Sequence, residues 1–273
     1  MDDCMSPDKL LEQIAQRNIV IYGAGHIAGK FLKALKLHHY DENVLCFVVT
    51  SPEQGLAMME GIPVRTVEWL GEHKDALVCI AVHEALRYDI AAVLRNIGVY
   101  EYIWIYPYLY ELLLGKPVRT NREIDLDEII RTCEDDYRLA IRYAVIEQYF
   151  GKNKVGYDLY RRAQALHSSR ETAEERLISF CSLIGKWQKN GYDGKSRIAI
   201  NTDYEIIDGN HRVALAKYYD QPQIMCDIYE KYMDVTELHG ENAMLTGRVL
   251  REGGFDDMEM DYLNQINRII KGG

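Results

Sequence analysis

The first half of the chain alternates short apolar runs with stretches whose apolar residues recur every three or four positions. Continuous apolar runs are typical of strands buried on both faces of a sheet, and the longer repeat is typical of helices. Strands are therefore predicted at 18–23, 44–49, 62–64, 76–82 and 102–107, and helices at 24–39, 66–72 and 84–98. Strands and helices that alternate in this way favour right-handed crossovers. We expect an α/β fold with a doubly wound parallel sheet.

The pattern changes at 112–128, where the sequence reads LLLGKPVRTNREIDLDE. Glycine, lysine and proline end the apolar run, and polar residues follow. We place a domain boundary here and divide the chain into domains 1–118 and 119–273. Helical spacing returns in the second domain, with helices predicted at 124–150, 156–168 and 171–189, the last of them beginning near Ser169.

In the segment after these helices, apolar and polar residues alternate again, as is typical of strands. Residues 197–201 and 204–207 are predicted to form a hairpin around Thr202 and Asp203, followed by a helix at 213–219 and a strand at 223–229. The second domain is thus a helical segment followed by an α+β region.

The C-terminal segment is predicted to end in a helix. Asp256 and Glu259 have the spacing of a capping box. One face of the helix is predicted to be core or dimer surface, so a homodimer is possible; its residues are Met258, Tyr262, Ile266 and Ile269.

Composition narrows the function classes. The formal net charge is −10 and the pI is about 5.3, which argues against broad binding to nucleic acid or to anionic membranes. The N-terminal residues lack the pattern of a signal peptide, and no apolar run is long enough to span a bilayer. The six cysteines show no CxxC spacing, so we expect reduced thiols in a cytoplasmic protein.

The turn after the first predicted strand carries candidate chemistry. Gly23, Gly25 and Ala28 fit the pattern G-x-G-x-x-[GA] between a strand and a helix. Gly23 permits a tight turn, Gly25 leaves room for a phosphate, and Ala28 allows close packing of helix on strand. The alternative is that the glycines serve only the turn. We expect a nucleotide or phosphate here.

Open parallel sheets bind ligands at the carboxyl ends of their strands. That rule adds His26, Thr50, His83 and Tyr106 as candidates. An NAD-binding site usually has Asp or Glu at the end of the second strand, where the carboxylate holds the ribose hydroxyls. This chain has Thr50 and Ser51 at that place. Hydride transfer with NAD(P) is therefore the weaker alternative.

The stretches IVIYGAGHIAGKFLKAL, GIPVRTVEWL and ALVCIAV carry a resemblance. Segment 17–107 resembles Rossmann-like domains attached to bacterial enzymes of surface polysaccharide and sugar modification. The resemblance implies that the first domain binds a nucleotide or a nucleotide sugar, without redox chemistry of its own.

A second candidate site follows the strand that ends in Ile206-Ile207. Gly209 gives the backbone freedom, and the helix start after it offers N–H donors to an anion. Arg212 supplies a fork suited to phosphate oxygens, and His211 can donate a hydrogen bond or transfer a proton. Asp208 can hold Mg²⁺, accept a proton, or cap the helix. Together these residues predict an anion site.

The block GKSRIAINTDYEIIDGNHRVALAK resembles the nucleotide-binding core of the ParB/sulfiredoxin superfamily over residues 176–229. The resemblance implies that Gly209, Asn210, His211 and Arg212 contact the phosphates of ATP or CTP. Asn210 stands where the reductase branch needs a cysteine, so that activity is disfavoured. A helix-turn-helix and a basic balance, signs of the DNA-binding branch, are also missing from the sequence.

The serine-kinase branch, with its D-G-x-H-R turn, fits best, and its members use a further carboxylate as base. Glu147, Asp158 and Asp203 are candidates among which the sequence does not choose. The leading hypothesis is a Mg²⁺-dependent phosphotransferase or NTPase with catalytic residues Asp208, His211 and Arg212. Its partners are a nucleotide and an unknown acceptor, in cell-surface polysaccharide or sugar metabolism. A non-catalytic binding or regulatory protein is the alternative.

Overall fold

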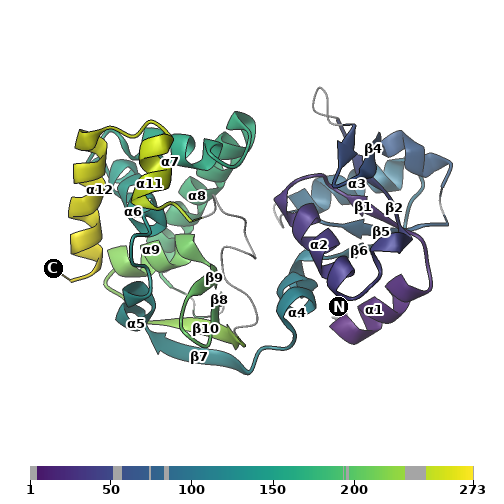
Figure 1. Ribbon diagram of the computed structural model, residues 1–273, viewed down its shortest axis with the longest axis horizontal. Helices are drawn as coiled ribbons and strands as arrows, with labels where there is room; N and C mark the ends of the chain where they lie inside the picture. The colour runs from purple at the N-terminus through teal and green to yellow at the C-terminus, as the bar shows by residue number, and fades with distance from the viewer. Residues whose placement is uncertain are drawn as a thin grey trace. The chain divides into compact units, whose positions relative to one another are not determined.

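The chain divides into two compact units, Met1–Gly115 and Lys116–Gly273 (Figure 1). The computed structural model describes residues 5–51, 57–73, 75–82, 86–192, 194, 197–230 and 244–272. The sequence predicts the division between residues 118 and 119.

The first unit contains a mostly parallel sheet of six strands in the order β3-β4-β2-β1-β5-β6. Only β3 among these six runs antiparallel to its neighbour, β4. The chain order reverses at β1, whose neighbours are β2 and β5. The strands are β1 (Ile19–Tyr22), β2 (Val44–Val49), β3 (Met58–Met59), β4 (Ile62–Thr66), β5 (Leu77–Ile80) and β6 (Tyr102–Trp104).

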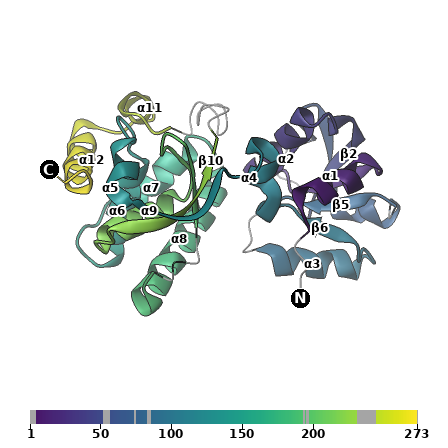
Figure 2. The same cartoon turned by 90° about the horizontal axis from the view of Figure 1, so that it is seen from below.

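Helical segments cover both faces of this sheet (Figures 1 and 2). Val20 and Tyr22 of β1 share a core cluster with Leu94 of α3, while Ile19 and Ile21 are buried on the opposite face. The alternation confirms a sheet buried on both sides. The segments are α1 (Pro7–Ala15), α2 (His26–Leu37), η1 (Asp41–Asn43), η2 (Val67–Gly71), α3 (Arg87–Asn96), η4 (Tyr106–Tyr108) and α4 (Leu109–Leu114).

The second unit is built mainly of helices. They are α5 (Leu126–Arg131), α6 (Arg138–Tyr149), α7 (Gly156–Ala165), α8 (Arg170–Asn190), α9 (Asn210–Tyr218), α11 (Gly247–Glu252) and α12 (Asp257–Ile270). Ser169 caps α8, as predicted, because its hydroxyl accepts the N–H of Thr172. In the part of the chain that the structure describes, no helix is both long and apolar enough to cross a membrane.

The single helix predicted at 124–150 is wrong, because the chain breaks between α5 and α6. Asp135 has a positive φ of 44°, which an α-helix does not allow. The carboxylate of the buried Asp136 accepts the N–H of Arg138 and starts α6 anew. A short polar side chain therefore replaces the helical hydrogen bonds at this point.

A four-stranded sheet of order β7-β10-β8-β9 completes the second unit. The strands are β7 (Arg119–Asp125), β8 (Ile198–Asn201), β9 (Ile206–Asp208) and β10 (Gln223–Tyr229). The β8–β9 hairpin and β10 confirm the predicted strands. The edge strand β7 was not predicted, because its side chains are almost all exposed and polar and show no apolar alternation.

The helix α12 has the predicted capping box of Asp256 and Glu259. Its predicted apolar face is wrong in part, since Met258 is 79% exposed and Ile269 is 53% exposed. The stripe that packs on the unit is rotated from the predicted one. It consists of Met260, Leu263, Ile266 and Ile270.

The five described cysteines are free. Burial raises the pKa of the Cys79 thiol to about 12 and that of Cys46 to about 11. These thiols stay protonated at neutral pH and behave as small apolar side chains. Cys181 is less buried than the others.

Candidate functional site

The helix α9 begins at Asn210, three residues earlier than predicted, with Gly209 as its N-cap. Asn210, His211 and Arg212 consequently lie in the first helical turn. Gly209 has φ of +119°, and a Cβ placed there would lie 2.6 Å from Cβ of Ile198 on β8. Both the backbone conformation and this close approach require glycine.

Asp208 is the last residue of β9, and its carboxylate does not cap α9. Its Oδ2 accepts a hydrogen bond from Nη2 of Arg212 at 3.2 Å. The other terminal nitrogen of Arg212 donates to the backbone carbonyl of Arg197. The guanidinium is therefore bound at the start of α9, next to the first-turn N–H groups.

His211 is held by two helices of the second unit. Its Nε2 lies 2.8 Å from the hydroxyl of Tyr160 on α7, and Tyr160 is fully buried. Its ring packs against Phe180 of α8 with ring centroids 4.3 Å apart. These contacts fix the orientation of the imidazole.

Asn210 carries an unsatisfied acceptor. Its Oδ1 is buried and has no hydrogen-bond partner in the described structure. Such an atom costs free energy unless a ligand or water satisfies it. An acceptor fits a donor such as a ligand hydroxyl better than it fits a phosphate oxygen.

A group of cationic side chains lies on the other side of the Tyr160 contact, and it was not predicted. Arg142 of α6 is only 8% exposed, and its Cζ lies 5.8 Å from the centroid of the Tyr160 ring. Its Nη1 donates to the carbonyl of Arg138, while its buried Nε has no partner. Arg176 of α8 donates to Oε1 of the buried Gln164 at 2.8 Å.

Burial outweighs the attraction of nearby groups in this cluster, since Asp136 raises the pKa of Arg142 but does not restore it. Burial is the main cause that lowers the pKa of Arg142 and of Arg176. The pKa of His167 is lowered to about 4, mainly by burial of its ring. The positive charges of Arg176 and Arg142 contribute to this lowering. Part of the His167 residue is nevertheless exposed at the surface. These shifts mean that His167 is neutral near pH 7.

One sequence signal could have found this group. Arg142 stands inside LAIRYAVI, where every fully apolar neighbour faces a core. An arginine on the buried face of a helix is expensive unless it has a partner.

The predicted residues of the first unit lie at the carboxyl ends of β1 and β2. Gly23 has φ of +111°, and a Cβ there would lie 2.7 Å from Cγ1 of Val82. The N-cap of α2 is Gly25, and a Cβ on it would meet no heavy atom within 4 Å. The first glycine is therefore required by the fold, whereas the second leaves open space.

The other two cofactor-binding candidates of this unit have different surroundings. Ala28 is buried inside α2, as close helix packing demands. Thr50 is exposed, and its Oγ1 lies 2.6 Å from the hydroxyl of Tyr22 at the end of β1. His26 is the exposed first residue of α2, and Tyr106 is partly buried. His83 lies outside the described residues.

The three candidate bases have contacts elsewhere in the second unit. Glu147 accepts a hydrogen bond from the Tyr262 hydroxyl at 2.8 Å, which ties α6 to α12. Asp158 lies 3.6 Å from Arg162 on the exposed side of α7. Asp203 lies in the hairpin turn, at the end of β9 opposite Asp208. The carboxylate at the start of α9 is Asp208 itself.

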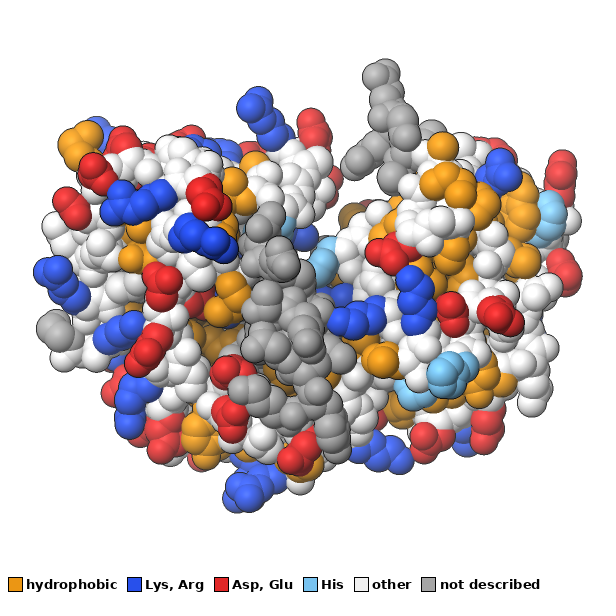
Figure 3. Space-filling model, viewed as in Figure 1, with side chains coloured by type: hydrophobic (Ala, Val, Ile, Leu, Met, Phe, Trp, Pro, Cys, Tyr) orange, Lys and Arg blue, Asp and Glu red, His pale blue; other side chains and the backbone are white. Residues whose placement is uncertain are grey.

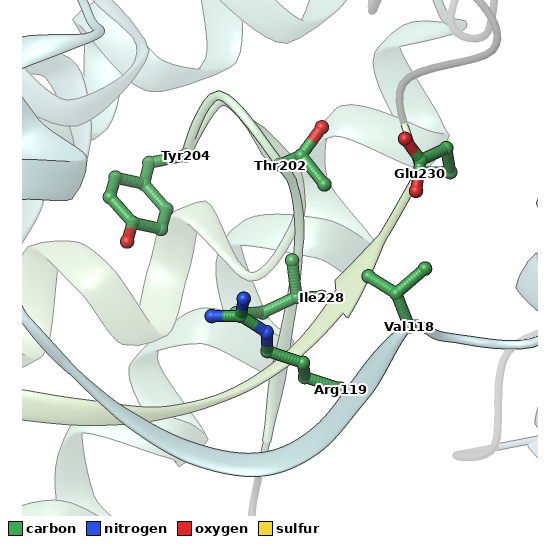
Figure 4. A pocket seen from close by; sticks show the side chains of 6 residues that line it. All are labelled: Val118, Arg119, Thr202, Tyr204, Ile228 and Glu230. Carbon is green, nitrogen blue, oxygen red and sulfur yellow. The ribbon is translucent and has the colours of Figure 1, made fainter.

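A shallow pocket of about 360 Å³ opens at the hairpin end of the second sheet (Figure 4). Its lining residues are Val118, Arg119, Thr202, Tyr204, Ile228 and Glu230. None of the residues at the start of α9 lines it. The pocket does not coincide with the candidate chemistry.

Metal ligands are sparse in the described structure. Among these residues, no group of three or more His, Cys, Asp or Glu side chains could hold a metal ion. Mg²⁺ usually keeps several waters and binds through one or two carboxylates plus substrate phosphates. A single carboxylate such as that of Asp208 is enough for this mode of binding. Mg²⁺ at Asp208 stays a prediction.

Comparisons with family models, with curated proteins and with solved structures find no match to this chain. The two family resemblances therefore stay predictions from the residues that carry them. What supports a function is the geometry of the described residues.

Proposed function

We propose that the second unit binds the triphosphate of ATP or CTP at the start of α9 and transfers the terminal phosphoryl group. The observation that carries the proposal is the gathering of Asp208, Asn210, His211 and Arg212 around the first turn of a helix opened by Gly209. The first N–H groups of a helix have no partner within the helix, and the dipole favours an anion. The proposed fold of this unit is that of the ParB-like core.

Arg212 is the phosphate ligand in this proposal. A triphosphate that approaches the first turn competes with Asp208 and with the carbonyl of Arg197 for its guanidinium. Phosphate oxygens suit the arginine fork, and charge-assisted hydrogen bonds are stronger than neutral ones. His211 then orients the phosphates, and Asn210 accepts a hydrogen bond from a ligand hydroxyl.

The transfer step forms a bond between the acceptor oxygen and the terminal phosphorus and breaks the bond from that phosphorus to the bridging oxygen. The nucleoside diphosphate leaves, and the acceptor proton passes to a base. Asp208 serves either as this base or as a ligand of Mg²⁺, which would neutralise phosphate charge. Water in place of the acceptor gives hydrolysis.

The first unit, in the same proposal, is a Rossmann-like domain that binds a second nucleotide or a nucleotide sugar. Its support is the reversal of strand order at β1 and the open space beside Gly25. Ligands of open α/β sheets bind where the strand order reverses. Acceptors from surface polysaccharide or sugar metabolism would fit this arrangement.

The test is nucleotide turnover by the full chain with ATP or CTP and Mg²⁺, alone and with serine or sugar acceptors. We expect Arg212→Met to lower turnover by roughly 100-fold, because it removes a donor to the transferred group. Lys217→Met is the matched control. It removes a cation from the same helix, where Lys217 pairs with Asp127, and should leave turnover unchanged.

Two results would contradict the proposal in different ways. Tight nucleotide binding without any product would replace the phosphotransferase by a non-catalytic binding protein. Turnover that is equal in Arg212→Met and in the parent chain would remove α9 from the reaction.

A further inference from the structure

Two arginines and a histidine from neighbouring segments come together in the second unit, and we name them the Arg142 cluster. Arg142 comes from α6 and Arg176 from α8, and His167 lies two residues after the end of α7. The two arginines lie close enough to lower the pKa of the histidine. Gln164 and Tyr160, both buried on α7, contact Arg176 and Arg142 respectively.

No carboxylate of the described residues lies within ion-pair distance of the two arginines of this cluster. Neither Arg142 nor Arg176 forms an ion pair with a carboxylate of the described residues, and the buried Nε of Arg142 donates to no atom. Asp136, the acid that raises the pKa of Arg142, forms its ion pair with Arg138 at 2.8 Å instead. A buried charge without a partner is costly, so its presence calls for a compensating ligand.

A neighbouring pair shows that the same helices place acids opposite arginines elsewhere. Arg161 of α7 forms an ion pair with Glu174 of α8 at the surface. Arg176 lies on the same helix as Glu174 but donates its hydrogen bond to the neutral side chain of Gln164. The surface arginine of this helix pair thus faces an acid, whereas Arg176 does not.

The cluster is reachable from solvent. His167 is exposed and Arg176 is partly exposed, whereas Arg142 is only 8% exposed. Arg176 is therefore the more accessible guanidinium of the cluster, and the unpaired Nε of Arg142 is buried.

We propose that the Arg142 cluster binds an oxyanion, a phosphate or carboxylate group of a small molecule. The guanidinium groups of Arg142 and Arg176 donate hydrogen bonds to it, and both oxyanions match the arginine fork. This site is separate from the start of α9 and does not rest on the nucleotide proposal. Tyr160 connects the two, since its ring lies by Arg142 and its hydroxyl by His211.

The test measures unfolding of the full chain by urea with inorganic phosphate or malonate, against sodium chloride of equal ionic strength. A ligand that binds the folded state alone raises stability with its concentration. We expect at least one oxyanion to raise the unfolding midpoint of the parent chain. The response to phosphate against that to malonate tells which group the site takes.

Arg142→Met should abolish this response without lowering the midpoint in chloride, because it removes an unpaired buried charge and keeps the aliphatic volume. A purely structural arginine would instead lower the midpoint in chloride. Arg176→Gln should weaken the rise of the midpoint with oxyanion. If Arg142→Met does not fold, the Arg176→Gln variant tests the proposal in its place, and an unweakened response would contradict the proposal. Arg161→Met, which removes a paired surface arginine from the same helices, should respond like the parent chain.

Arg212→Met separates this site from the proposed nucleotide site, and its response to oxyanions should persist. If Arg212→Met loses the response while Arg142→Met keeps it, the oxyanion binds at α9 and the cluster proposal is wrong. The absence of any stabilisation by phosphate and by malonate would also overturn it.

Discussion

Gly209 is the residue on which the geometry of the α9 start depends most directly. Gly209→Ala places a side chain at positive φ and against Ile198. We expect it to lower the free energy of unfolding by about 3 kcal/mol, from backbone strain and overpacking. Urea unfolding measures the change.

Gly25→Ser is the control for this substitution. Gly25 has an extended backbone and open space around it, and serine is a good N-cap residue for α2. Its stability should equal or exceed that of the parent chain. Equal losses in both variants would mean that the close approach to Ile198 is wrong.

His167 predicts a dependence of stability on pH. Its folded pKa of about 4 lies below the unfolded value of about 6.5, so the unfolded chain binds the proton first. Stability attributable to this residue is therefore present above the unfolded pKa and is lost as the pH falls from about 6.5 toward 4. His167→Gln should show a smaller loss between pH 7 and pH 5 in chloride buffer, measured by urea unfolding. An identical loss in variant and parent would contradict the low pKa.

Residues that carry local chemistry were predictable in part. Asp208, Gly209, His211 and Arg212 were found because glycine and charge stand together between a strand and a helix. The contacts of His211 with Tyr160 and Phe180 were not predictable, because those residues are distant in the sequence and meet only when α7 and α8 pack. Arg142 could be noticed in the sequence because it stands within an apolar helical run. Tyr160, which it contacts, comes from another helix and could not be predicted.

The helix α12 offers a prediction at the scale of an element. Its buried stripe includes Leu263, which is fully buried, whereas Met258 of the same helix is 79% exposed. Leu263→Ala should cost about 3 kcal/mol of unfolding free energy, and Met258→Ala should change it by less than about 0.5 kcal/mol. Thermal or urea unfolding of the two variants checks this. A larger effect from Met258→Ala would restore the face predicted from the sequence.

Elements buried on both sides were the easiest to predict, because continuous apolar runs such as those of β1, β2 and β5 have few alternatives. The polar edge strand β7 gave no such signal, since the backbone of β10 rather than an apolar face holds it in place. The break between α5 and α6 was hidden because the apolar spacing continues across it. In α12 two sets of apolar residues have helical spacing, and packing alone decides between them.

At the scale of the whole molecule, charge is distributed unevenly between surface and interior. The net charge is −10, and acidic and basic side chains are interspersed on the face seen in Figure 3. The Arg142 cluster concentrates positive charge in the second unit, where the total for the chain does not reveal it. The amino-acid composition could therefore predict the net negative charge of the chain, but not a local concentration of positive charge.

Each unit is one unbroken stretch of sequence, and the chain passes between them once, just after Gly115. Because β7 pairs with β10, a cut that preserves both sheets must fall before Arg119. A gene divided between the codons for Gly115 and Arg119 would encode each sheet with all of its strands. Such a division would leave the strand pairing of both sheets intact.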